Sequence, residues 1–103
     1  MEIKITPKAH GDILEIFNYV KKDGEQIAKN QVKLIYDGIE RLGLFPNMGT
    51  ALQKHVERPT KLRYLILNKI YIVIYDVSDF VEIIRVFRKE QDFISILGIG
   101  DEQ

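Results

Sequence analysis

The chain has 103 residues, of which 46% are hydrophobic and 29% charged, a composition typical of one globular domain over residues 1–103. It contains no cysteine, which excludes disulfides, thiolate metal sites and cysteine nucleophiles. Fifteen Lys and Arg balance fifteen Asp and Glu, and this neutrality counts against a protein that coats nucleic acid.

No apolar run approaches the roughly 18 residues that a membrane-spanning helix needs. The first residues, Met1–Ile5, lack the basic-then-apolar pattern of a signal peptide. We therefore expect a cytoplasmic protein with no membrane association.

The first half of the chain predicts a strand and two helices. Alternation over residues 2–6 predicts a short strand, and Thr6-Pro7 is typical of the start of a helix that continues to Lys22. A second helix follows, with Asp23 expected to cap it and Gln26 to complete a capping box. Gly38 lies inside this helix, and we expect it to allow close approach of the first helix. The short link between the two predicts an antiparallel helical hairpin.

The second half predicts a sheet. A turn at Phe45–Gly49 leads into a loop over residues 50–61 that shows no periodicity. Three strands and a short helix are then predicted, at residues 62–67, 70–75, 80–88 and 91–97. The turn between the first two strands is expected at Asn68-Lys69, where Asn tolerates a positive φ.

The apolar run of the middle strand predicts a central position, buried on both sides. Residues 98–103 are expected to be a frayed tail.

The predicted fold class is therefore α+β in two layers. An antiparallel sheet, made of the N-terminal strand and the three-strand meander, is covered on one face by the helical hairpin. The opposite face is expected to be left for partners.

Charge is unevenly distributed along this neutral chain. Residues 54–89 contain eight basic and four acidic side chains, whereas residues 90–103 contain four acidic and no basic ones. The basic segment is consistent with an anionic partner, but equally with an ordinary solvated surface. Arg63 and Arg85 interrupt apolar strands, so each is either paired internally, for instance Arg63 with Glu82, or directed to a functional surface. Strand register, which decides whether the two share a face, does not follow from the sequence.

The sequence contains few groups suited to chemistry. His10 and His55 have no partners at metal-ligand spacing, and there is no glycine-rich phosphate loop, so no metal or cofactor is predicted. His55 lies in the basic loop and is the natural candidate for a general acid or base.

Short motifs spread from Ile3 to Leu97 are similar to those of one protein family. The first helix, with Ala9, Asp12-Ile13, Ile16 and Tyr19, is similar to A-x-x-D-L-x-x-I-x-x-Y. Further matches are Leu42, Phe45-Pro46 and Met48-Gly49 (L-x-x-F-P-x-M-G), Leu62-Arg63 with Tyr71–Tyr75 (L-R and Y-x-I-x-Y), and Ile83, Arg85-Val86 and Asp92 (I-x-R-V and R-D). Through them the chain resembles the RelE/ParE superfamily of type II toxin–antitoxin toxins.

This resemblance implies a toxin that a cognate antitoxin neutralises in a hetero-oligomer. RelE-like members cut mRNA on the ribosome and are enzymes, whereas ParE-like members inhibit DNA gyrase without chemistry of their own. The P-x-M-G junction resembles the ParE-like branch, but Arg88 and Gln91 stand where that branch usually has His and Arg. We therefore expect a gyrase inhibitor, with a ribosome-dependent mRNA endonuclease as the alternative and an inactive remnant that only binds antitoxin as a third possibility.

Two sets of candidate site residues follow. For a nuclease the catalytic set is Lys54, His55, Arg63, Arg85 and Arg88, with Glu57 as another possible base. For binding of antitoxin or target, the set is Lys61, Arg63, Arg85, Arg88 and Lys89.

Overall fold

The computed structural model describes residues 1–98, and the predicted frayed tail beyond Gly98 lies outside the described residues. The predicted strands and helices begin and end within about two residues of their expected positions, and a two-residue strand, β2, is added to them. They are β1 (Ile3–Ile5), α1 (Pro7–Val20), α2 (Glu25–Leu44), β2 (Thr50–Ala51), β3 (Arg63–Leu67), β4 (Tyr71–Val77), β5 (Val81–Arg88) and α3 (Phe93–Leu97), with 3₁₀ turns at Lys21–Asp23 and Leu52–Lys54.

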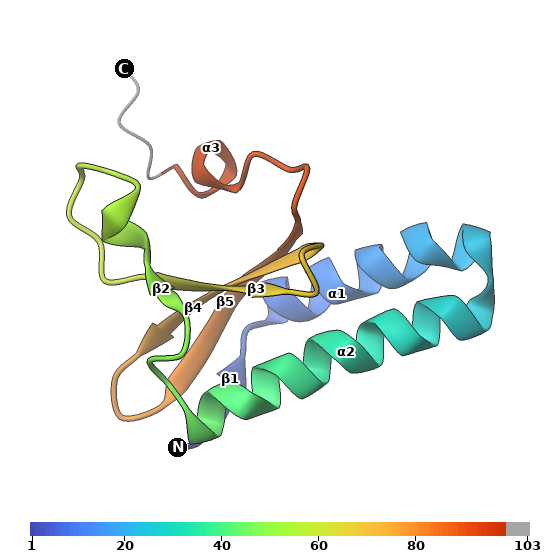
Figure 1. The fold of residues 1–103 in the computed structure, drawn as a ribbon, viewed down its shortest axis with the longest axis horizontal. Helices are drawn as coiled ribbons and strands as arrows, with labels where there is room; N and C mark the ends of the chain where they lie inside the picture. Colours follow the sequence, from blue (N-terminus) through green and yellow to red (C-terminus); the bar gives the residue numbers. More distant parts are fainter. Residues whose placement is uncertain (99–103) are drawn as a thin grey trace.

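The five strands form one sheet in the order β1-β5-β4-β3-β2, and the hairpin of α1 and α2 covers one face of it (Figure 1). This confirms the predicted α+β fold class. β1 lies at one edge and pairs with β5 in parallel, whereas the remaining pairs are antiparallel. The other edge is β2, which the sequence does not predict because a strand of two residues has no measurable periodicity.

The main core lies between the helical hairpin and the sheet. It is built from apolar side chains of α1, α2 and the three long strands, including Ile13, Ile35, Leu42, Val73 and Ile83. Residues 71–75 of β4 are all buried, which confirms the predicted central strand.

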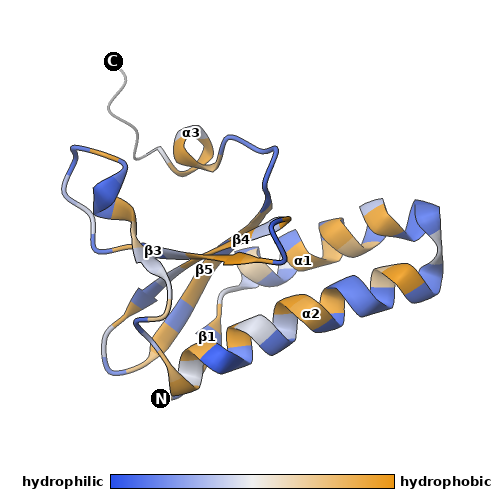
Figure 2. Cartoon of the chain, in the orientation of Figure 1, coloured by the Kyte–Doolittle hydropathy of each residue, from blue (hydrophilic) through white to orange (hydrophobic). Residues whose placement is uncertain are grey.

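The opposite face of the sheet is only partly open, which corrects the prediction that it is left for partners. Ile72, Ile74 and Phe87 are buried there beneath Phe93 and Leu97 of α3. The rings of Phe87 and Phe93 are stacked with centroids 6.2 Å apart. Figure 2 shows the hydrophobic colouring that α3 shares with the strands. A short helix at the end of the chain therefore covers part of the surface that we assigned to partners.

The two helix starts differ from each other in how well the sequence predicts them. The Thr6 hydroxyl accepts a hydrogen bond from the Ala9 N–H at 3.1 Å, with Pro7 in the first turn, as predicted. Asp23 does not cap α2: it ends a 3₁₀ turn, and Gly24 at φ 137° is the N-cap. Gln26 donates to Asn30 instead of completing a capping box.

Gly38 brings α2 close to the sheet rather than to α1, which corrects the prediction. A Cβ added there would lie 2.5 and 2.6 Å from the two methyl carbons of Leu67 on β3. The helix therefore packs its backbone directly against a buried leucine.

The β3–β4 turn has the predicted positive φ at Asn68 (51°), and Lys69 (59°) shares it. Leu67 pairs with Tyr71, so the loop contains Ile70 as well as the two residues predicted.

Candidate functional site

The candidate site residues occupy separate parts of the molecule. Directly paired residues on neighbouring strands point to the same face of a sheet. Arg63 pairs with Tyr75, which belongs to the core under the helices, whereas Arg85 pairs with Ile74, which belongs to the α3 face. The two arginines therefore start from opposite faces. A bulge opposite Ile74 and Tyr75 produces this arrangement, because Tyr75 pairs with Ile83 and leaves Ile84 unmatched.

Arg85 is bound by a buried carboxylate from α1. Its Nε and Nη2 donate to the two oxygens of Asp12 at 2.7 and 3.0 Å, and the backbone N–H of Val86 donates to the same carboxylate at 2.9 Å. The hydrogen bond to Asp12 raises the pKa of Arg85 above its ordinary value. The guanidinium also lies 4.6 Å from the ring centre of Phe87. The predicted alternative of an internal ion pair therefore holds for Arg85.

Arg63 also makes internal contacts, but with backbone carbonyls rather than with Glu82 as predicted. Its Nη2 donates to the carbonyls of Gly49 at 2.6 Å and Asn47 at 3.2 Å. Arg63 thus fastens the segment that joins α2 to the sheet.

Tyr75 binds the same segment through its hydroxyl group. Its fully buried hydroxyl donates to the Pro46 carbonyl at 2.8 Å and accepts from the Gly49 N–H at 3.0 Å. A Cβ on Gly49 would collide with the Tyr64 carbonyl and lie 2.7 Å from the Tyr75 hydroxyl, so this position requires glycine. Sequence reasoning assigned Tyr75 to the core and missed this role, because a hydroxyl's partner cannot be deduced from strand periodicity.

His55 pairs with Tyr64. The imidazole Nε2 lies 2.7 Å from the Tyr64 hydroxyl, and the two rings meet edge to face with centroids 5.4 Å apart. Lys54 is the exposed neighbour of His55 in the 3₁₀ turn. The His55–Tyr64 contact holds the loop after β2 against β3.

The remaining candidate cations are Arg88, Lys61 and Lys89. The Arg88 guanidinium carbon is 4.1 Å from the ring centre of Tyr19, and its Nε is 3.3 Å from a Glu90 oxygen. Lys61 is 3.3 Å from Asp76 at the far end of β4, and Lys89 is exposed.

Arg85 and Arg88 line one polar hollow of about 180 Å³. Of the five residues in the predicted nuclease set, the structure brings these two together and leaves Arg63 on the opposite face.

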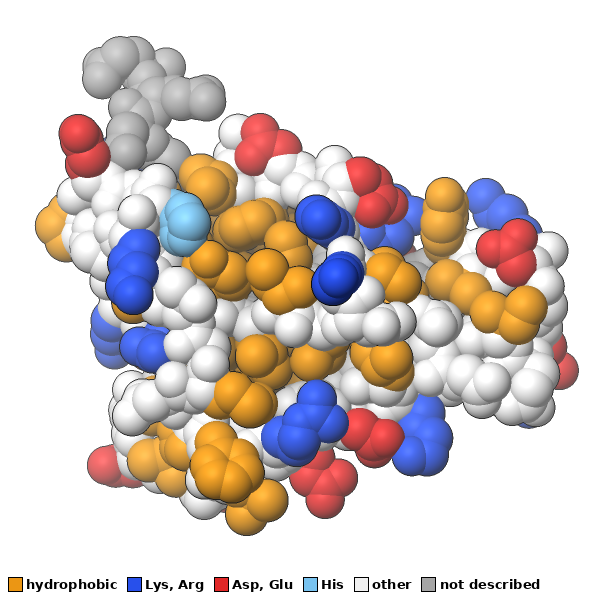
Figure 3. Space-filling model, in the orientation of Figure 1, with side chains coloured by type: hydrophobic (Ala, Val, Ile, Leu, Met, Phe, Trp, Pro, Cys, Tyr) orange, Lys and Arg blue, Asp and Glu red, His pale blue; other side chains and the backbone are white. Residues whose placement is uncertain are grey.

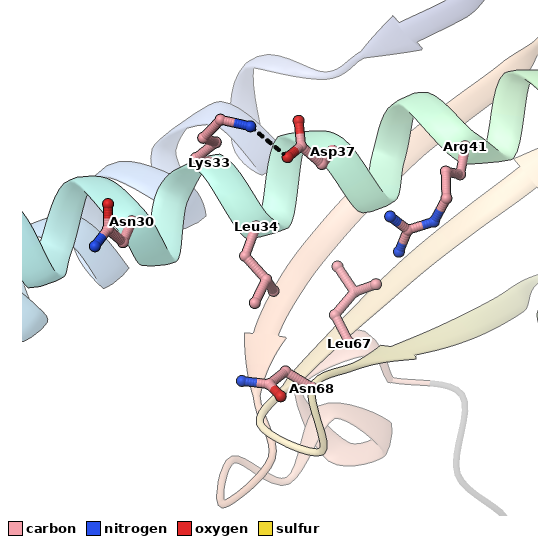
Figure 4. Close-up of a pocket in the computed structure, with 7 residues that line it drawn as sticks. All are labelled: Asn30, Lys33, Leu34, Asp37, Arg41, Leu67 and Asn68. Carbon is pink, nitrogen blue, oxygen red and sulfur yellow. Dashed lines mark hydrogen bonds and ion pairs between the residues drawn. The ribbon is translucent and has the colours of Figure 1, made fainter.

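Two grooves are lined mainly by residues that the sequence analysis did not select. One, of about 260 Å³, is apolar and lies between α1 and α2; its lining residues are His10, Ile13, Leu14, Phe17, Val32 and Tyr36. The other, of about 510 Å³, lies between α2 and the β3–β4 turn, with the Lys33–Asp37 ion pair and Arg41 on its helical side and Leu67 opposite (Figure 4). Both were missed because each arises only where the faces of two separate elements meet.

Among residues 1–98 there is no group of three or more His, Cys, Asp or Glu that could hold a metal ion. No helix in that range is long and apolar enough to cross a membrane.

Comparison with known proteins finds a matching family and similar solved structures. The family described as ParE toxin of type II toxin-antitoxin system, parDE, matches residues 3–93. The solved structure of the chromosomal ParDE TA system from P. aeruginosa is similar, with a TM-score of 0.75 and 25% identity, and the alignment covers 87% of this chain and 97% of that chain. No curated protein sequence matches the chain.

Replacing the buried carboxylate, Asp12→Ala, should lower the free energy of unfolding by about 3 kcal/mol, because it leaves the Arg85 charge and the Val86 N–H without their partner. Urea denaturation followed by circular dichroism measures the change. Asp37→Ala, which breaks the exposed pair with Lys33, is the matched control and should leave the midpoint unchanged. Equal effects of the two substitutions would contradict the role given to Asp12.

Tyr75→Phe should lower the free energy of unfolding by about 1–2 kcal/mol, because the Pro46 carbonyl and the Gly49 N–H lose their partner. Tyr64→Phe removes a hydroxyl that pairs with an exposed imidazole, and this variant should stay within about 0.5 kcal/mol of the parent chain. In amide hydrogen exchange, only the first variant should speed exchange at Gly49. If both variants unfold at the same urea concentration, Tyr75 does not fasten the junction.

Proposed function

The chain belongs to the ParE toxin family of type II toxin–antitoxin systems, and from this premise we propose that it inhibits DNA gyrase by direct binding and is neutralised by a cognate antitoxin. The observation that carries the proposal is that Arg63 and Arg85, which interrupt apolar strands, both bind groups within the chain. Cleavage of RNA through its 2′-hydroxyl needs a base and a cation that stabilises the extra charge on the phosphate. Arg63 donates to backbone carbonyls and Arg85 to Asp12, so both guanidinium groups already have partners within the chain.

The apolar groove between α1 and α2 supports the antitoxin half of the proposal. Leu14, which lines it, is 60% exposed, and Tyr19 and Ile27 on the same hairpin are 51% and 48% exposed. An amphipathic segment of a partner would bury these side chains, which is a common mode of peptide recognition. We therefore place antitoxin binding on the helical hairpin, in a toxin–antitoxin hetero-oligomer.

The proposal gives the basic residues of the predicted binding set two different roles. Arg63 and Arg85 have structural roles, which leaves Lys61, Arg88 and Lys89 as cations that reach the surface. They would contribute to binding an acidic partner segment through long-range attraction rather than as buried contacts.

A ribosome-dependent mRNA endonuclease is the second candidate, and the His55–Tyr64 pair is the observation that favours it. Two groups that can exchange a proton lie 2.7 Å apart beside Lys54. A remnant that only binds antitoxin is the third reading, and growth arrest on expression would remove it.

In a supercoiling assay with purified components, micromolar toxin should prevent DNA gyrase from introducing negative supercoils into relaxed plasmid. The reason is that the chain needs no other factor if it binds the enzyme directly. Topoisomerase I in the same buffer is the control and should keep its activity. Full gyrase activity at these toxin concentrations would overturn the proposal.

His55→Ala separates the two candidate functions. It should inhibit gyrase as the parent chain does and should still arrest growth when expressed without antitoxin. A nuclease that used His55 as its base would lose at least about a hundredfold in cleavage rate. Loss of growth arrest in a variant that folds normally by circular dichroism would favour the endonuclease.

A further inference from the structure

Large apolar side chains gather at the corner of the molecule where α2 ends. Leu44 is 74% exposed, Phe45 60% and Met48 41%, and Met1 at 58% adjoins them. The amino group of Met1 donates to the Gly43 carbonyl at 2.7 Å, which ties the start of the chain to this corner. Figure 3 shows hydrophobic side chains grouped at the end of the molecule where the N-terminus lies. We refer to Met1, Leu44, Phe45 and Met48 as the junction surface.

The backbone under the junction surface is fixed at nearly every residue. The Phe45 N–H donates to the Arg41 carbonyl at 2.9 Å, and the Met48 N–H donates to the Phe45 carbonyl at 3.0 Å. Between and beyond them, Tyr75 holds Pro46 and Gly49, as described above.

Arg63 adds the third constraint by binding the carbonyls of Asn47 and Gly49. A guanidinium and a buried hydroxyl thus hold rigid a turn whose own large side chains are exposed to solvent. Exposed loops are usually polar and mobile, so a rigid apolar turn has the properties of a preorganised binding element, which loses little entropy when a partner binds.

The chemistry of the junction surface indicates a folded protein as its partner. Phe and Met are enriched at the buried centres of protein interfaces, and Met adapts its shape to an irregular pocket. Arg41 lies one turn before Phe45 and is exposed, but its side chain lines the groove between α2 and the β3–β4 turn (Figure 4). Because the four side chains of the junction surface are apolar, the complementary surface is an apolar pocket.

The groove and the junction surface differ in shape. The groove between α1 and α2 is a concave surface that could receive a segment, whereas the junction surface is a turn at the end of a helix. We propose that the junction surface is where the toxin binds its protein target, with Phe45 and Met48 inserted into a pocket of that target. The inference rests on the proposed function, since it takes DNA gyrase as the target.

The test is the double variant Phe45→Ala/Met48→Ala, assayed for inhibition of supercoiling by purified gyrase. The toxin concentration for half inhibition should rise by at least about tenfold, as expected when central interface anchors are truncated. Ile66→Ala is the matched control, because Ile66 is 51% exposed but lies on β3, outside the junction surface. It should inhibit gyrase as the parent chain does. Circular dichroism should show both variants folded.

The outcomes separate this inference from the proposed function. If the parent chain inhibits gyrase and the double variant inhibits it equally well, the junction surface is not the target site. If the parent chain leaves gyrase active but arrests growth on expression, gyrase is the wrong target, and loss of arrest in the double variant still supports the inference.

Growth arrest that persists in the double variant overturns the inference. A parent chain that neither inhibits gyrase nor arrests growth overturns both. If sedimentation shows that the double variant only weakens self-association, with inhibition unchanged, the surface joins two copies of the chain and the inference is wrong.

Discussion

The carboxylate of Asp12 joins the first helix to the last long strand, and the arrangement of the sheet edge depends on it. β1 pairs with β5 only from Val81 to Ile83, so the edge of β5 continues beyond its partner strand. Buried backbone groups need hydrogen-bond partners. Side chains of the N-terminal segment provide them: the Thr6 hydroxyl donates to the Ile84 carbonyl, and Asp12 accepts from the Val86 N–H. The same carboxylate neutralises Arg85, which the bulge in β5 places within reach.

This arrangement determines which side chains remain available to bind a partner or to catalyse a reaction. Arg85 neutralises Asp12, and Arg63 fastens the turn after α2, so the two arginines that interrupt apolar strands are both structural. The surfaces that remain exposed include two apolar ones: a groove between the helices and a turn at the end of α2. A protein with these surfaces is suited to binding other proteins. These surfaces support the proposed inhibition by binding over cleavage, and the proposal assigns the antitoxin and the target to separate surfaces.

Much of the fold follows from the sequence because its patterns are local. The helical stripe of α1, the Thr6 cap and the buried run of β4 are each decided by residues close together in the chain, and the structure confirms them. The errors come from contacts between distant residues. Gly38 packs on Leu67 rather than on α1, Gly24 rather than Asp23 caps α2, and α3 covers a face expected to be open. For the site, the sequence identified the unusual arginines but not their partners, since strand register and the bulge decide which face each one occupies.

The most direct test of the central claim, that this toxin acts on a protein and not on RNA, is made in one culture. The chain is expressed without antitoxin, and plasmid supercoiling and the integrity of a reporter mRNA are measured at the same time points. The account predicts that negative supercoiling is lost while the mRNA stays intact until growth has stopped. Cleavage of the mRNA at codon boundaries with supercoiling preserved would contradict it.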